Sequence, residues 1–223
     1  MKYIRSEKYN TPALQKKMMG PNPVKLEEEL LLNHRIPEKA VVCDLGSGEG
    51  LTSVFLAKEY GFTVYAADLW SDPRENRKFF DAMGLKQEQI IPVKADASDL
   101  PFEKDFFDAV VSVDSYNYFG RDEHYLDDKL LPFVKSGGFI YIAIPGMKKT
   151  VTTICPKSFC FPGCRSRWTI CTIRNTGAGR WASAREQRFF PSRKWRATRR
   201  SGPIGWPRTT STPQATARQW RPA

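Results

Sequence analysis

Three glycines at alternate positions form the most distinctive chemical pattern of this chain. Gly46, Gly48 and Gly50 follow the apolar run 40–45 and precede a helix-like stretch. Glycine lets the backbone turn sharply and approach a ligand, and the free N–H groups at the start of a helix favour an electron-rich or anionic group. The spacing therefore predicts a ligand-binding loop. The simpler alternative is a plain turn between a strand and a helix.

Acidic residues end four successive predicted strands, at Asp44, Asp68, Asp96 and Asp114. Ligands of open α/β sheets bind outside the carboxyl ends of the strands, so we expect the four acids to converge on one crevice. An acid about 20 residues after a glycine loop holds ribose hydroxyls in dinucleotide folds, which is the spacing of Asp68. Asp96 is placed to accept a hydrogen bond from an adenine amino group. Any one of these acids alone also fits a solvated loop residue.

The elements that must position these residues alternate between strands and helices. Periodicity and turn residues predict strands over 40–45, 63–67, 90–93, 107–113 and 139–144, and helices over 25–32, 52–60, 74–83 and 123–133. The strands read as continuous apolar runs, which is typical of strands buried on both faces. The alternation predicts an α/β fold with a doubly wound, mostly parallel Rossmann-like sheet.

Five segments together resemble the class I S-adenosylmethionine-dependent methyltransferases. They are 42–50 (VCDLGSGEG), 66–69 (AADL), 96–102 (DASDLPF), 107–114 (FDAVVSVD) and 131–139 (LPFVKSGGF). The pattern of these segments resembles the small-molecule and lipid-modifying branch, which includes ubiquinone methylases and proteins like cyclopropane fatty acid synthase. The resemblance implies an enzyme that uses S-adenosylmethionine and a small-molecule or lipid methyl acceptor.

The resemblance also implies which residues bind the cofactor and the acceptor. The glycine loop would run alongside the methionine moiety, and the acid of the second strand would hold the ribose. The acid and the alanine after the third strand would flank adenine. The implied cofactor set is Asp44, Gly46, Ser47, Gly48, Gly50, Asp68, Leu69, Asp96, Ala97 and Asp114. Within 114–118, Tyr116 would bind the acceptor.

The reaction itself asks for little covalent help, because a sulfonium methyl is already activated and the protein mainly aligns the reacting atoms. A base is needed only for a protonated acceptor, and His124 and Tyr116 are the candidates on the relevant side. His124 equally fits the exposed surface of a helix, so the catalytic residue stays open. The segment 18–23 (MMGPNP) is either a lid over the cofactor, as in related proteins, or a helix-breaking linker.

The formal net charge of +11 is concentrated in the last third of the chain. Residues 150–223 contain 15 Lys/Arg, a single acid, Glu186, and no leucine, whereas residues 1–149 contain 20 Lys/Arg, 23 Asp/Glu and fourteen leucines. We therefore predict a methyltransferase domain over 1–149 and a disordered Arg-rich tail over 150–223. The sheet would then lack the antiparallel hairpin that normally follows its fifth strand. A reading-frame shift near Lys149 or Thr150 would explain this composition.

Other functions are less compatible with these patterns. The Arg/Trp-rich tail suggests a protein that binds nucleic acid or anionic surfaces. The tail does not belong to a recognisable nucleic-acid-binding module, so we expect no specific nucleic-acid partner. An NAD-dependent oxidoreductase would favour a G-x-G-x-x-G loop. The cysteine spacings match no common zinc pattern, and we expect no metal. The sequence shows neither a secretory signal nor a run of about 18 apolar residues, which predicts a cytoplasmic protein without a transmembrane segment.

Overall fold

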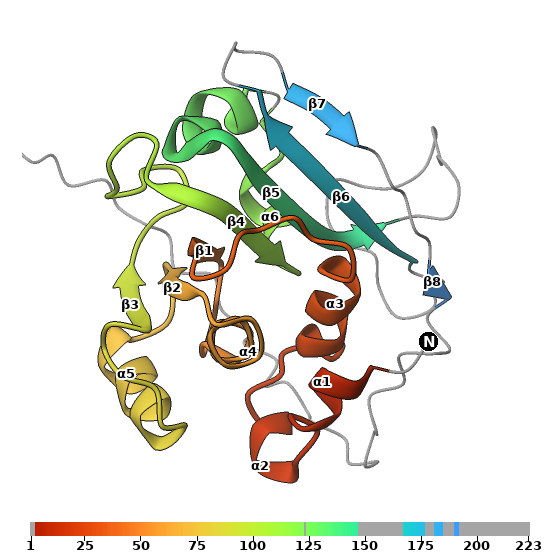
Figure 1. The fold of residues 1–223 in the computed structure, drawn as a ribbon. Helices are drawn as coiled ribbons and strands as arrows, with labels where there is room; N and C mark the ends of the chain where they lie inside the picture. The colour runs from red at the N-terminus through yellow and green to blue at the C-terminus, as the bar shows by residue number, and fades with distance from the viewer. Residues whose placement is uncertain (1–2, 123, 147–166, 177–180, 185–189, 192–223) are drawn as a thin grey trace, which may run out of the picture.

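The computed structural model of this chain describes residues 3–122, 124–146, 167–176, 181–184 and 190–191. Its strands form one sheet in the order β3-β2-β1-β4-β5-β6-β7, and β8 pairs with β6 (Figure 1). The strands are β1 (Val41–Leu45), β2 (Thr63–Asp68), β3 (Ile90–Lys94), β4 (Phe107–Val113), β5 (Val134–Gly146), β6 (Arg167–Asn175), β7 (Trp181–Ala184) and β8 (Phe190–Pro191). The pairings among β1 to β5 are parallel, which confirms the predicted mostly parallel Rossmann-like sheet.

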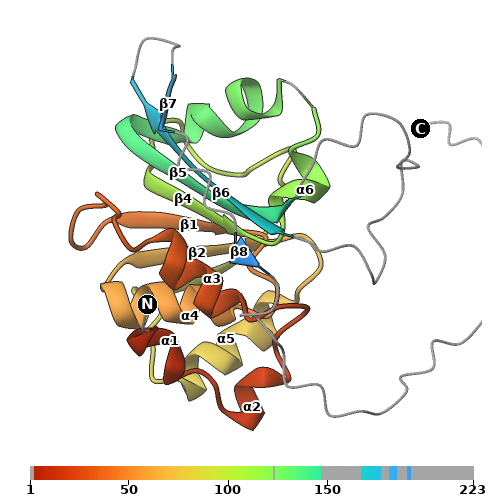
Figure 2. The same cartoon turned by 90° about the vertical axis from the view of Figure 1, so that its right-hand side faces the viewer.

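Helices cover both faces of this sheet, as the two views in Figure 1 and Figure 2 show. On one face lie α1 (Ile4–Glu7), α2 (Pro12–Gln15), α3 (Pro23–Leu30), α4 (Leu51–Tyr60) and α5 (Pro73–Ala82); on the other lie α6 (Tyr116–Phe119), the π-helix η1 (Tyr125–Leu130) and the 3-10 helix η2 (Leu131–Phe133). Each face has its own apolar core, centred on Phe55 and Phe80 in one case and on Phe107 and Leu130 in the other. No helix in the described part of the chain is long and apolar enough to cross a membrane.

Local sequence signals explain where the helices around the glycine loop begin and end. Helix α3 starts after Asn22, whose side chain accepts a hydrogen bond from the Lys25 N–H, and Pro23 occupies its first turn. Helix α4 lies between Gly50 and Gly61, which both adopt the left-handed conformation. These signals fix the entry of α4 directly after the glycine loop.

The predicted helix over 123–133 is wrong in type. The chain instead forms a π-helical turn over 125–130 and a 3-10 turn over 131–133. Pro132 has no N–H to donate, so a regular α-helix cannot run through it. Strand β5 starts earlier than predicted, at Val134, and the turn expected at Gly137 and Gly138 is an irregularity inside this strand, where its register with β4 shifts.

The C-terminal edge of the sheet corrects a second prediction, because residues after 149 do supply strands. Strand β6 pairs antiparallel with β5 along its whole length, and β7 and β8 pair with β6. The β6 sequence RWTICTIRN is rich in β-branched residues, which favour a strand next to an open sheet edge. Ile173 is buried, and the Asn175 side-chain amide donates to the Val134 carbonyl at 2.7 Å. The sheet therefore extends beyond the predicted domain boundary.

The rest of the predicted disordered tail lies outside the described residues, which include only 167–176, 181–184 and 190–191 of the region after 149. The fold does not test the reading-frame hypothesis, which concerns the gene. That hypothesis stays a prediction.

Candidate functional site

A cavity of about 820 Å³ opens at the carboxyl ends of β1, β2, β3 and β4. Eight of the ten predicted cofactor residues line it: Gly46, Ser47, Gly48, Asp68, Leu69, Asp96, Ala97 and Asp114. The size falls within the range of roughly 300–1,000 Å³ that is usual for small-molecule sites. The expected convergence of strand ends on one crevice is thus present for three of the four acids, Asp68, Asp96 and Asp114.

Asp68 holds the backbone on two sides of the cavity. Its Oδ2 accepts a hydrogen bond from the Gly48 N–H at 3.0 Å, and its Oδ1 accepts from the N–H groups of Trp70 and Ser71 at 2.8 and 2.7 Å. A carboxylate that accepts several backbone N–H groups makes strong, charge-assisted bonds. Asp68 therefore fixes the glycine loop relative to the turn after β2, in addition to the ribose contact predicted for it.

Asn76 reinforces the same connection and was not predicted from the sequence. This buried residue of α5 donates its side-chain amide to the Gly48 carbonyl at 3.0 Å and to the Ser71 hydroxyl at 3.2 Å. Its position in a helix of mixed composition carries no motif. The one available signal was its polar side chain on the helix face that also carries the buried Phe80.

Asp44 does not reach the cavity, contrary to the prediction. Its Oδ2 accepts hydrogen bonds from the hydroxyls of Thr52 and Ser53 at 2.7 and 2.6 Å, beneath the first turn of α4. Burial raises the pKa of Asp44 to about 6, although the two hydroxyl hydrogen bonds oppose this shift. Asp44 therefore anchors α4 behind the glycine loop. The pair Thr52 and Ser53 lay just beyond the segment that the sequence singled out.

The three glycines of the loop have different roles. A Cβ at Gly46 would collide with the Ser115 side chain, and one at Gly50 would collide with the Phe80 ring, so both positions are fixed by packing. Gly50 does not line the cavity, which corrects its predicted role as a cofactor residue. A Cβ at Gly48 would meet only the flexible end of Met19, at 3.3 Å. Gly48 is therefore the glycine of the loop at which an added side chain would mainly occupy cavity space.

Ser47 offers a polar atom that suits a bound ligand. Its hydroxyl is buried on the cavity wall and has no hydrogen-bond partner among the described residues. A buried hydroxyl without a partner costs free energy, which a ligand acceptor or donor can recover. Together with the open space at Gly48, this hydroxyl fits the methionine moiety of S-adenosylmethionine next to the loop.

The β2 and β3 side of the cavity has the apolar surface and the polar edge that a nucleoside needs. Leu69 and Trp70 lie on the wall with 39% and 88% of their surface exposed. Asp96 follows the neighbouring strand β3 and accepts hydrogen bonds from the N–H and the hydroxyl of Ser98, both at 2.8 Å, which lower the pKa of Asp96. Ala97 is held in place by the Tyr125 hydroxyl, which donates to its carbonyl at 2.8 Å.

On the β4 side of the cavity, neither Tyr116 nor His124 lies on the wall. Tyr116 does not line the cavity but packs edge-on against the rings of Phe119 and Tyr125. His124 is exposed and also lies off the wall. Tyr118 lines the cavity instead, with 75% of its surface exposed. The segment 114–118 reaches the cavity, but the short helix α6 brings Tyr118 rather than Tyr116 to its wall.

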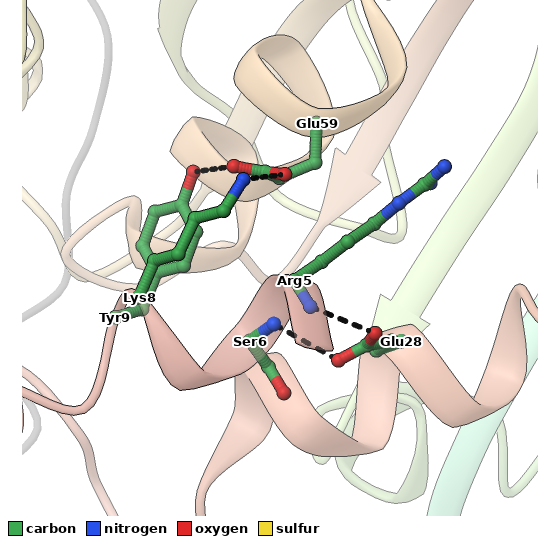
Figure 3. A network of polar contacts seen from close by, with 6 residues as sticks. All are labelled: Arg5, Ser6, Lys8, Tyr9, Glu28 and Glu59. Carbon is green, nitrogen blue, oxygen red and sulfur yellow. Dashed lines mark hydrogen bonds and ion pairs between the residues drawn. The ribbon is translucent and has the colours of Figure 1, made fainter. Parts of the chain in front are cut away.

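The N-terminal segment is tied to the body by two acids, as Figure 3 shows. Glu28 of α3 accepts hydrogen bonds from the N–H groups of Arg5 and Ser6 at 3.1 and 2.9 Å. Glu59 of α4 accepts from the Lys8 ammonium and the Tyr9 hydroxyl at 2.8 and 3.1 Å. These contacts hold α1 against α3 and α4.

The chain between α2 and α3 then passes over the cavity. Lys17, Met19, Gly20 and Pro23 all belong to its wall. The Lys17 ammonium lies 2.8 Å from a carboxylate oxygen of Glu49 in the glycine loop. The segment predicted as a lid or a linker thus forms one side of the cavity.

Comparison with known proteins agrees with this geometry. Residues 42–138 match the model of a family described as a methyltransferase domain. Comparison with curated proteins gives no match. The matched segment contains the glycine loop and the ends of strands β1 to β4.

Solved structures share the fold at low sequence identity. Phosphoethanolamine N-methyltransferase 2 of Haemonchus contortus, in complex with phosphomonomethylethanolamine and S-adenosylhomocysteine, is 21% identical, with a TM-score of 0.50 over 65% of this chain and 33% of that one. The [4+2]-cyclase SpnF is 16% identical, with a TM-score of 0.52 over 57% of this chain and 47% of that one. A methyltransferase of Aquifex aeolicus is 18% identical, with a TM-score of 0.49 over 70% and 79% of the two chains.

Residues 42–138 match a methyltransferase domain. The glycine loop and the parallel sheet around it are similar to those of class I S-adenosylmethionine-dependent methyltransferases, a family whose cofactor is S-adenosylmethionine. The chain spans about half the length of several of the solved structures that it matches. Because the [4+2]-cyclase SpnF shares the fold, the fold alone does not define the reaction.

Proposed function

We propose that this chain transfers a methyl group from S-adenosylmethionine to a small-molecule or lipid acceptor. The observation that carries this proposal is the cavity at the ends of β1 to β4, in which the glycine loop and the acids after β2 and β3 share one wall. The methyl on the sulfonium of the cofactor is already activated, so the protein has to bind, orient and exclude water.

Different residues of this wall would contact different parts of the cofactor. Gly48 leaves room for the methionine moiety, and the Ser47 hydroxyl supplies a polar contact there. Asp68 would hold the ribose. Its Oδ2 accepts one backbone hydrogen bond from the described residues, so a second lone pair can accept from a ribose hydroxyl. Leu69 and Ala97 provide apolar surfaces for adenine, and Asp96 provides an acceptor for the adenine amino group.

The apolar rim of the cavity supports an acceptor with an apolar part. Met19 and Tyr118 are 72% and 75% exposed, and both line the cavity: the end of Met19 lies beside Gly48, and Tyr118 belongs to α6 after β4. Exposed large apolar side chains that gather around a cavity mark an interaction site. This rim favours a small organic molecule or a lipid over a strongly polar polymer as the acceptor.

The segment from Lys17 to Pro23 would act as a lid over both ligands. Its contact with the glycine loop is the ion pair between Lys17 and Glu49, in which the Glu49 side chain is 51% exposed. Exposed ion pairs are worth roughly 0–1 kcal/mol, so this contact can open and close at little cost. Gly20, with a φ of 88°, provides the sharp bend that brings the segment over the wall.

Replacing Gly48 by valine tests the proposal at the cofactor. We expect isothermal titration calorimetry with S-adenosylhomocysteine to show binding by the parent protein and none by Gly48→Val, because the new side chain occupies the cavity. Gly61→Val is the matched control: Gly61 also has a positive φ, of 70°, but it lies in open space at the far end of α4. Retained binding in Gly48→Val, or equal loss in both variants, would show that the loop is only structural.

A further inference from the structure

Four carboxylates stand on the wall of the cavity, and they are not equivalent. Glu49 belongs to an ion pair, Asp68 accepts three backbone N–H groups, and Asp96 accepts the N–H and the hydroxyl of a nearby serine. Asp114 is different, because no described residue gives its carboxylate a hydrogen bond or an ion pair. Its side chain is only partly buried, and it is the carboxylate of this wall that has no protein partner among the described residues.

The backbone holds Asp114 firmly in a costly conformation. Its φ of 58° lies in the left-handed region, which aspartate tolerates better than most side chains. Its N–H donates to the Ala143 carbonyl at 2.8 Å, which fixes the residue at the end of β4. Strained backbone of this kind is often retained at functional sites.

The lid covers this carboxylate and keeps it partly out of water. A Cβ at Gly20 would lie only 3.3 Å from Oδ2 of Asp114, so a glycine is what lets the lid pass this close. Burial raises the pKa of Asp114 to about 6, and no neighbouring charge contributes to this shift. The carboxylate is therefore largely ionised at neutral pH, although no cation of the described residues is paired with it.

The position of Asp114 separates it from the nucleoside side of the cavity. It follows β4, whereas Asp68 and Asp96 follow β2 and β3, and β1 lies between β2 and β4 in the sheet. The neighbouring Ser115 donates its hydroxyl to the Leu45 carbonyl at 2.8 Å, which places this turn beside the start of the glycine loop. Asp114 therefore faces the end of the cavity where the methionine moiety and the acceptor would meet.

We propose that Asp114 binds the protonated amino group of the methyl acceptor, so that the acceptor is an amine. This inference rests on the methyl transfer proposed above. The carboxylate would first pair with the ammonium group and then take one proton from it. The freed nitrogen lone pair would form the bond to the methyl carbon while the carbon–sulfur bond breaks, with its electron pair going to sulfur.

Two nucleosides test this assignment without knowledge of the acceptor. Sinefungin carries a protonated amine on carbon where S-adenosylmethionine carries its methyl sulfonium, and S-adenosylhomocysteine has an uncharged thioether sulfur there; the two share the nucleoside and the α-amino acid. By calorimetry at about pH 7.5, we expect the parent protein to bind sinefungin at least about tenfold more tightly than S-adenosylhomocysteine, in line with a hydrogen bond between charged groups. Asp114→Asn should lose this preference and keep its affinity for S-adenosylhomocysteine.

The control is Asp96→Asn, which removes another wall carboxylate on the nucleoside side. It should weaken both nucleosides alike and leave their affinity ratio unchanged. If Asp114→Asn keeps the preference for sinefungin, or weakens both nucleosides equally, Asp114 does not serve the acceptor; equal weakening would assign it to the α-amino group of the cofactor. If neither nucleoside binds the parent protein, the proposed methyl transfer itself fails, and this inference with it.

A second measurement follows the ratio with pH. The other charged groups on this wall are Lys17, Glu49, Asp68 and Asp96, and burial raises the pKa of Asp114 to about 6. The amine of sinefungin stays protonated well above this range. The preference for sinefungin should therefore fall as the pH is lowered from about 7.5 to about 5 in the parent protein and stay flat in Asp114→Asn. A preference independent of pH in the parent protein would overturn the assignment.

Discussion

The floor of the cavity and helix α3 both bury carboxylates, but they supply them with different partners. Asp68 has 9% of its surface exposed and accepts three backbone N–H groups. Glu27 of α3 is fully buried, and neither of its carboxylate oxygens has a hydrogen-bond partner among the described residues. The next residue, Glu28, is nearly as buried and accepts two backbone N–H groups from α1.

The difference teaches that burial alone does not determine what an acid does. A carboxylate with N–H donors stays ionised and connects separate segments of backbone. A carboxylate without donors pays for its desolvation by taking up a proton. Accordingly, burial and the nearby Asp44 raise the pKa of Glu27 well above its ordinary value. Three substitutions can break or sharpen this contrast.

The largest effect is expected for Asp68→Ala. Hydrogen bonds to charged groups are worth roughly 1.5–3 kcal/mol each, and this change removes three of them together with the predicted ribose contact. We expect the affinity for S-adenosylhomocysteine to fall at least about 100-fold in calorimetry. Asp96→Ala is the comparison, because Asp96 is exposed and its partners all belong to Ser98. An Asp68→Ala variant that binds as tightly as the parent would disprove the role given to the carboxylate after β2.

A smaller effect is expected for Glu28→Ala, which frees the N–H groups of Arg5 and Ser6 at the start of α1. The free energy of unfolding should fall by about 1–3 kcal/mol in urea titrations, and amide hydrogen exchange should rise in α1. Glu7→Ala serves as the control, since the Glu7 side chain is 63% exposed and its ion pair with Lys25 is 3.8 Å long. Equal losses in the two variants would mean that the two hydrogen bonds accepted by Glu28 contribute no more to the free energy of unfolding than an exposed surface charge does.

Much of this fold could be predicted because its signals are local. The βα alternation, the start of α3 at Asn22 and the glycines on either side of α4 all depend on neighbouring residues. Eight of ten cofactor residues were placed on the wall by the same logic, since strand ends of a parallel sheet face one crevice. The strand over 167–175 was missed, because the composition of the whole tail outweighed the β-branched residues of this short segment.

The errors at the site have a common physical cause, which is that sequence spacing does not show where a side chain points. Asp44 precedes the glycine loop directly, yet two hydroxyls from the next turn hold it in the interior. Tyr116 and Tyr118 are two residues apart on a four-residue helix, and only their packing decides which of them faces the cavity. That Glu27 and Asp114 find no partner among the described residues is likewise a property of the fold, because it depends on residues distant in sequence.

The smallest effect is expected for Glu27→Gln, and its sign depends on pH. A carboxyl group whose pKa is raised on folding binds its proton more tightly in the folded state, so its contribution to stability is fully present below the unfolded pKa. That contribution is lost as the pH rises from about 4.5 through the raised folded pKa. Glutamine keeps nearly the same shape and carries no charge at any pH, so this part of the pH dependence should disappear. We expect Glu27→Gln to match the parent protein at about pH 4.5 and to be more stable by at least about 1 kcal/mol at pH 8, since each pKa unit corresponds to 1.36 kcal/mol.

Urea titrations at the two pH values measure the difference, and the exposed Glu103, changed to glutamine, provides a control that should alter neither value. Asp44 remains in both proteins, and its repulsion of an ionised Glu27 is part of the effect that the comparison measures. If the parent protein has a higher free energy of unfolding than Glu27→Gln at pH 8, then Glu27 is ionised and has a partner. The contrast with Asp68 would then fail.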